Sequence, residues 1–143
     1  MSPYNCTNSE IKGVAASADS GYYVVIGDYE LARLDKNGII LWTRRLNLGN
    51  LGPISVPYII TDSQSDVYTV TGAFNNGWTV TKVDKNGNLQ WNRLFRLSYN
   101  PGSGPGPTEF AIPSGMHLLN DKLYVWEMRI VMSTLLISVL LPG

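Results

Sequence analysis

The sequence predicts an all-β protein of antiparallel sheets stacked face to face. Two observations lead to this fold class: a repeated segment and a composition that favours strands. Residues 34–42 read LDKNGIILW and residues 83–91 read VDKNGNLQW, so one turn and one tryptophan occur twice. Tyr, Trp, Val, Ile and Thr are abundant, while only 15% of the residues are charged, against roughly 25% in an average soluble domain.

The repeat is centred on a polar turn. Aligning residues 29–46 with residues 78–95 pairs six identical residues, namely Asp35/Asp84, Lys36/Lys85, Asn37/Asn86, Gly38/Gly87, Trp42/Trp91 and Arg44/Arg93. Asn-Gly between apolar runs predicts a β-hairpin, because glycine supplies a positive φ and asparagine tolerates one. The aspartate accepts hydrogen bonds from amides of its own turn. Turn chemistry therefore explains the DKNG run, which lacks the acidic residue that ends a calcium loop.

The strands beside this turn are apolar on both faces. Ala32 and Leu34 share one face of the expected strand, whereas Tyr29 and Leu31 share the other. A strand of this kind needs cover on both sides, which stacked sheets provide. We therefore expect the repeated tryptophans to lie in the core between neighbouring sheets.

A further strand precedes each hairpin, and a third unit begins late in the chain. The relevant segments are GYYVVIGD (21–28), DVYTVTGA (66–73) and DKLYVWE (121–127). Each unit is expected to contain a strand, a short loop, a strand, the DKNG turn and another strand. We expect one domain, 1–143, divided into unit one (about 14–50), unit two (about 58–98), a Pro/Gly-rich loop (99–113) and a degenerate third unit (114–143).

The C-terminal tail is apolar from residue 130 to residue 141. It is shorter than the roughly 20 residues that a membrane-spanning helix needs, so no transmembrane helix is expected. Three interpretations remain open. The tail forms a strand pair of the third unit, forms an oligomer or membrane-surface segment, or does not belong to the domain.

These residues resemble the blade motif of β-propeller repeat proteins. ARLDKNGIILW and TKVDKNGNLQW are similar to blades of quinoprotein-type propellers and of bacterial surface-protein propellers. The resemblance covers residues 15–97 and, more weakly, 115–127. It implies four-stranded, propeller-like blades, two complete and one degenerate, in an incomplete or open propeller, since closed propellers have about four to eight blades. It also implies an extracellular or cell-surface location, although the N-terminus has no signal-peptide pattern.

The sequence offers little for catalysis. Eleven basic and eleven acidic residues give zero net charge, which argues against a nucleic-acid partner. His117 is the only histidine and Cys6 the only cysteine, and no nucleophile-elbow motif is present. His117 is expected to be an ordinary strand residue of the third unit. We predict no catalytic, cofactor or metal site, and no enzyme. A quinone-dependent dehydrogenase, which the resemblance suggests, would need a full ring, a calcium ion and a cofactor pocket.

The expected function is that of a non-catalytic scaffold or interaction module, part of or derived from a larger propeller. Its partner would be another protein, or further copies of the chain that complete the blades. The alternative is a carbohydrate- or cell-surface-binding module, in which a glycan stacks on aromatic rings. An insertion before the second hairpin is expected to expose Trp78. The candidate ligand or partner contacts are Tyr22, Tyr23, Tyr68, Asn75, Asn76 and Trp78.

Overall fold

The computed structural model describes residues 10–27, 30–46, 54–73, 77–95, 111–129 and 141–142. Every regular element in these ranges is a β-strand, and the strands form three antiparallel sheets. The first sheet contains β1 (Ile11–Ala16), β2 (Tyr22–Ile26), β3 (Glu30–Leu34) and β4 (Ile40–Arg45). The second contains β5 (Ile54–Thr61), β6 (Val67–Ala73), β7 (Gly77–Val83) and β8 (Leu89–Phe95). The third contains β9 (Ala111–Leu119), β10 (Lys122–Arg129) and β11 (Leu141–Pro142).

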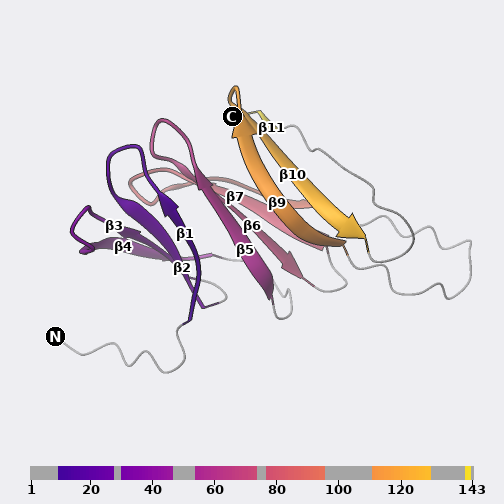
Figure 1. The fold of residues 1–143 in the computed structure, drawn as a ribbon, viewed down its shortest axis with the longest axis horizontal. Helices are drawn as coiled ribbons and strands as arrows, with labels where there is room; N and C mark the ends of the chain where they lie inside the picture. The colour runs from indigo at the N-terminus through magenta and orange to yellow at the C-terminus, as the bar shows by residue number, and fades with distance from the viewer. Residues whose placement is uncertain are drawn as a thin grey trace, which may run out of the picture.

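The three sheets are stacked in chain order (Figure 1). Their first strands are neighbours, because β5 contacts both β1 and β9. Each four-stranded sheet is a simple meander that runs from its first strand to its fourth. The sheets do not close into a ring within the described part of the chain. The predicted fold class, all-β with blade-like antiparallel sheets in an open arrangement, is confirmed.

The residue pattern predicted three strands per unit, but each complete sheet has four. The missed strands are β1 and β5, which begin their sheets. β1 has the sequence IKGVAA, whose small residues give a weak alternating pattern, and β5 includes Pro57, which is uncommon inside strands. Both strands are fixed by pairing along their length, β1 with β2 and β5 with β6. Similarly, β9 begins at Ala111, inside the range expected as a loop.

The third sheet is the least complete. β9 and β10 form a hairpin through Asn120 and Asp121, both of which have a positive φ, as a tight two-residue turn requires. β11 pairs with β10, with Leu141 opposite Leu123. Residues 130–140 of the apolar tail lie outside the described residues, so the three interpretations of the tail stay open.

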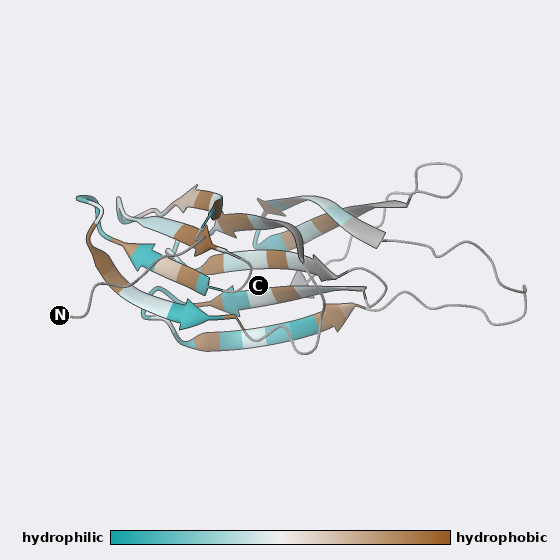
Figure 2. Ribbon diagram, turned by 90° about the horizontal axis from the view of Figure 1, so that it is seen from below, coloured by the Kyte–Doolittle hydropathy of each residue, from teal (hydrophilic) through white to brown (hydrophobic). Residues whose placement is uncertain are grey.

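Apolar and polar residues alternate along the strands (Figure 2), and the buried apolar side chains form two cores, one at each junction between sheets. Between the first and second sheets, buried side chains of both sheets form a cluster of Tyr23, Val25, Leu31, Leu46, Val67 and Val83. Between the second and third sheets, a second cluster comprises Tyr68, Val70, Trp78, Val80, Leu123 and Val125. The second sheet is therefore covered on both faces, as the apolar character of its strands demands.

The repeated tryptophans lie at the margins of these cores, so the expectation that they are core residues needs correction. Trp42 and Trp91 are each only partly buried, and each packs against one cluster without belonging to its buried set. Trp91 meets Tyr68 edge-on at 6.1 Å between ring centroids, while the Arg93 guanidinium lies 5.5 Å from its ring. The reason is its position on β8, the last strand of the second sheet, whereas β9 of the third sheet packs against β5, β6 and β7.

The two DKNG turns have the same geometry. The Asp35 Oδ1 atom accepts hydrogen bonds from the amides of Asn37 and Ile39, both at 2.8 Å. Asp84 accepts the equivalent bonds from Asn86 at 2.9 Å and Asn88 at 2.8 Å. Only the glycines of these turns have a positive φ, so the expectation that the asparagines share the left-handed region is not met. The aspartate cap holds a longer turn, followed by a bulge, in which glycine alone needs that conformation.

Trp42 connects the first sheet to the turn of the second. Its Nε1 atom donates a hydrogen bond to the Lys85 carbonyl at 3.0 Å. Its ring lies against Gly87, where an added Cβ would be 3.2 Å from the Trp42 Cδ2 atom. The same position in the first sheet, Gly38, has nothing within 4 Å of such a Cβ. One turn is therefore covered by an indole, whereas its repeat is open.

The two glycines provide a matched test of this contact. Gly38→Ala should destabilise the protein by about 1 kcal/mol, the cost of a left-handed φ at a residue with a side chain. Gly87→Ala should cost about 1–3 kcal/mol more, because the new methyl group also meets Trp42. Urea unfolding of both variants measures the difference. Equal losses would contradict the packing of the indole on the second turn.

Candidate functional site

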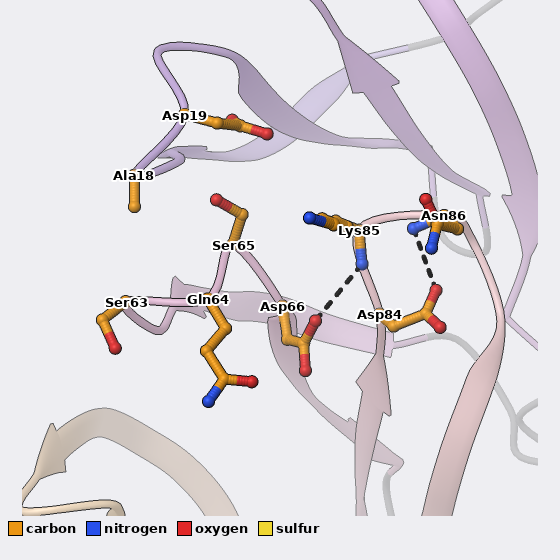
Figure 3. A pocket seen from close by; sticks show the side chains of 9 residues that line it. All are labelled: Ala18, Asp19, Ser63, Gln64, Ser65, Asp66, Asp84, Lys85 and Asn86. Atoms are coloured by element: carbon orange, nitrogen blue, oxygen red, sulfur yellow. Dashed lines mark hydrogen bonds between the residues drawn. The ribbon is translucent and has the colours of Figure 1, made fainter.

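Three turns of the first and second sheets line an open polar hollow of about 610 Å³ at one edge of the stack (Figure 3). One turn joins β1 to β2, one joins β5 to β6, and the third is the second DKNG turn. The lining residues are Ala18, Asp19, Ser63, Gln64, Ser65, Asp66, Asp84, Lys85 and Asn86. The first two turns are repeats of each other, because Ser20 and Ser65 occupy the same place with φ of 71° and 69°.

A buried cation supports the first of these turns. Arg33 is 3% exposed and forms an ion pair with Asp19, whose side chain is 47% exposed. The hydrogen bond from Arg33 holds the pKa of the Asp19 carboxyl at about 2, despite the opposing effect of partial burial. The guanidinium also lies over the ring of Tyr23, 4.5 Å from its centroid. This arrangement needs a residue without a side chain at Gly21, where a Cβ would meet both terminal nitrogens of Arg33.

Tyr23 bridges the first two sheets. Its hydroxyl donates a hydrogen bond to the Ser65 carbonyl at 2.6 Å, and its ring meets Trp42 edge-on at 5.9 Å. Burial raises the pKa of Tyr23 to about 12, so its hydroxyl keeps its proton and remains a donor. Tyr23 therefore has a structural role, and its ring has no exposed face for a ligand.

The second sheet repeats this arrangement with a lysine. Lys82 forms ion pairs with Asp66 at 3.2 Å and Asp62 at 3.6 Å, and lies 5.0 Å from the centroid of the Tyr68 ring. Burial opposes the charge of Lys82, but its interactions with Tyr68 and Asp66 outweigh that effect and raise its pKa. The Tyr68 hydroxyl lies 3.2 Å from Asp62 Oδ2, within its own sheet. Tyr68 is 2% exposed, so it too belongs to the core.

The carboxylates around the hollow serve the turns that carry them. Asp19 binds Arg33, while Asp66 accepts a hydrogen bond from the Lys85 amide and pairs with Lys82. Asp84 accepts bonds from its turn and from the side chains of Asn88 and Gln90. No three metal-ligating side chains come together among the described residues. His117 is an exposed residue of β9 in the third sheet, as expected.

The expectation that an insertion exposes Trp78 is wrong. β7 begins at Gly77, so Trp78 is a strand residue that faces the third sheet; it is 4% exposed and stacks on Phe95 at 4.3 Å between ring centroids. Asn75 and Asn76 lie outside the described residues. Of the four candidate aromatic residues, Tyr22 alone is substantially exposed, at 43%. The structure therefore does not bring the candidate contacts together into one aromatic surface.

Tyr22 belongs instead to the outer face of the first sheet. Strand pairing places Ala16, Tyr22, Leu34 and Ile40 in one row across this face. The equivalent row of the second sheet is Thr61, Val67, Val83 and Leu89. The first sheet covers its two valines completely, whereas Leu89 remains 50% exposed. The first sheet and its turn carry four further exposed apolar residues, namely Ile11, Val14, Ile39 and Leu41.

Sequence reasoning missed this surface, although the repeat carried the signal. After the shared turn, the first copy reads Ile39-Ile40-Leu41 where the second reads Asn88-Leu89-Gln90. The apolar residues belong to the first sheet, whose outer face no described element covers. These three positions are exposed in both copies, so the copies differ in the polarity of the residues there and not in their exposure.

The outer face of the third sheet mixes aromatic side chains with the exposed polar residues His117 and Lys122. Tyr124 and Trp126 point away from the second sheet, because their neighbours Leu123 and Val125 point into the shared core. Trp126 is 36% exposed and lies over Gly115, where no side chain could be accommodated. Leu119 is also exposed on this strand pair.

These features define a class of protein: an open stack of blade-like antiparallel sheets whose first and last sheets expose apolar side chains on their outer faces. Within the described residues there is no helix of the length and hydrophobicity that a membrane span requires. A solved protein of unknown function from Bacteroides caccae is similar in structure, with a TM-score of 0.48 and 10% identity over 87% of this chain. The match covers 45% of that protein, so the chain spans less than half its length. No protein-family model matches the chain, and no curated protein matches its sequence significantly.

The ion pair at the first turn should show in the stability of the protein. Asp19→Asn leaves the buried Arg33 without its counter-ion and should cost about 1–2 kcal/mol, less than the roughly 3–5 kcal/mol of a fully buried pair because Asp19 is half exposed. Because the folded pKa is lowered, the wild-type advantage should be complete above pH 3.8 and disappear as pH falls toward 2. Unfolding by urea at several pH values measures this.

The exposed pair of Lys12 and Glu10 serves as the control. Glu10→Gln should change the free energy of unfolding by less than about 0.5 kcal/mol at any of these pH values. A loss in Asp19→Asn that is independent of pH would show that the carboxylate charge does not stabilise Arg33.

Proposed function

We propose that this chain is a non-catalytic interaction module, built of propeller-like blades, whose outer sheet faces bind further protein. The observation that carries this proposal is the exposure of Tyr22 on the outer face of the first sheet, at a position that is buried in the second sheet. Tyr22 is 43% exposed, whereas its equivalent Val67 is fully buried. Large exposed apolar patches on soluble proteins mark interaction surfaces.

The repeated motif supports the propeller-like part of the proposal. The DKNG turn and its tryptophan resemble propeller blades, and the stacked meanders with adjacent first strands suit that arrangement. The finer assignment to quinoprotein-like or bacterial surface-protein blades is part of this proposal.

The polar hollow supports a structural role better than a catalytic one. Its aspartates are engaged with amides, lysine or arginine of the surrounding turns, and the pKa values of Asp19 and Asp84 are lowered rather than raised. Catalytic carboxylates usually need a perturbed environment that keeps a proton or a nucleophile available. The carbohydrate alternative would rest on Tyr22 alone, because the rings of Tyr23, Tyr68 and Trp78 are buried.

An apolar dye tests whether the first outer face is an open binding surface. At concentrations where the chain is monomeric, 1-anilinonaphthalene-8-sulfonate should fluoresce with the wild type, and the Tyr22→Asp/Ile40→Asp variant should lose most of that signal because its apolar row is broken. Leu94→Asp is the matched control, since Leu94 is also 43% exposed but lies on the second sheet.

The control variant should keep most of the dye signal, and circular dichroism should show that all three proteins retain their β structure. Absence of dye binding by the wild type, or equal losses in both variants, would contradict the proposal that this face is an interaction surface.

A further inference from the structure

The two faces of each sheet are chemically different. The forward face, toward the next sheet in chain order, carries an equivalent tyrosine in each sheet: Tyr23, Tyr68 and Tyr124. The rear face, toward the preceding sheet, carries the row that includes Tyr22 in the first sheet and Val67 in the second. In both junctions of the stack, a forward face packs on a rear face.

The first junction shows what this contact requires. Tyr23 on the forward face donates a hydrogen bond to the Ser65 carbonyl in the β5–β6 turn of the next sheet. Trp42 reaches the Lys85 carbonyl of the same sheet. In return, the Thr61 hydroxyl of the rear face donates to the Ala16 carbonyl at 2.6 Å. Between these bonds, Val67 and Val83 of the rear face are buried.

The chain leaves one face of each kind without a described partner. No described element covers the rear face of the first sheet, where Tyr22 and Ile40 are exposed beside the buried Val24 and Ala32, or the forward face of the third sheet. A chain with both halves of one junction carries the means to bind another copy of itself. Zero net charge adds no overall repulsion between copies.

Extending the interaction proposed above, and resting on it, we propose that two copies of this chain bind head to tail. The forward face of each third sheet covers the rear face of the partner's first sheet. Two such contacts related by a twofold axis form a closed assembly. It would contain six sheets, within the range of about four to eight blades found in closed propellers, whereas three copies would exceed that range.

The junction inside the chain indicates the key contact between copies. Ser20 has the same left-handed backbone conformation as Ser65, in a turn with the same hydrogen bonds. The Ser20 carbonyl is therefore the equivalent acceptor on the open rear face, and Tyr124 is the equivalent donor on the open forward face. Tyr22 and Leu34 would then be covered as their equivalents Val67 and Val83 already are, whereas Ile40 would stay at the margin of the contact, like its equivalent Leu89.

Solution mass gives the first test. Size-exclusion chromatography with light scattering should give twice the 15.8 kDa mass of the chain for the wild type. Tyr22→Asp places a charge on the rear face of the first sheet, and Tyr124→Asp places a charge on the forward face of the third sheet. Each variant should weaken the dimer by more than about tenfold, because a charge enters an apolar contact. Leu94→Asp, away from both faces, should remain dimeric.

Mixing the two variants gives the decisive test. Each retains the face that the other lacks, so an equimolar mixture should recover a dimer held by one junction, although neither variant dimerises alone. Circular dichroism and urea unfolding check that both variants are folded before mixing. Recovery on mixing supports the head-to-tail contact.

Three outcomes would overturn the proposal. A wild-type monomer at all concentrations would exclude the second copy as partner, and if dye still binds to the outer face, the interaction module itself stands. A dimer that survives Tyr124→Asp, or variants that do not recover on mixing, would indicate a different interface. Open-ended assemblies would exclude closure by two copies.

Discussion

The structure depends on one repeated contact, in which the forward face of a sheet packs on the rear face of the next. A single four-stranded sheet of this chain cannot bury both of its apolar faces, so its stability requires neighbours. Tyr23 and Trp42 make the contact specific as well as apolar, because each pairs a large ring with a hydrogen bond to a turn of the second sheet. Moving a sheet along its neighbour would break both bonds and leave the buried Tyr23 hydroxyl unpaired.

The repeat predicted this architecture through its turns more than through its strands. Gly38 and Gly87 provide the positive φ that the turn requires, and the aspartates before them accept hydrogen bonds from the turn amides. The four residues DKNG therefore specify a hairpin. The first strands could not be predicted in the same way, because β1 and β5 are held by pairing rather than by alternation. The burial of Trp78 could not be predicted either, since it depends on packing against the third sheet, which is formed by a distant part of the chain. The partial exposure of Trp91 depends on the same packing, because the third sheet leaves the edge strand β8 less covered.

The candidate site shows the same limit. In the sequence, nothing distinguishes Asp19, Arg33 and Tyr23 from other residues of the same types. Only the fold places the guanidinium between the carboxylate and the ring. The second sheet achieves a related arrangement with Lys82, Asp66 and Tyr68, although arginine and lysine have different geometries. A cation over a tyrosine is thus a feature of both sheets. In both sheets, an ion pair links this cation to a carboxylate of a polar turn at the edge of the stack.

The two repeats differ most where their surroundings differ. Asn88 and Gln90 donate side-chain hydrogen bonds to Asp84, which reinforces the turn that receives Trp42. In the first sheet these positions are Ile39 and Leu41, which cannot donate, so that turn lacks the additional bonds and exposes apolar surface. Exposed isoleucine and leucine do not stabilise a turn and reduce solubility. In the proposed interaction module, this apolar surface would contribute to the interface at the first sheet.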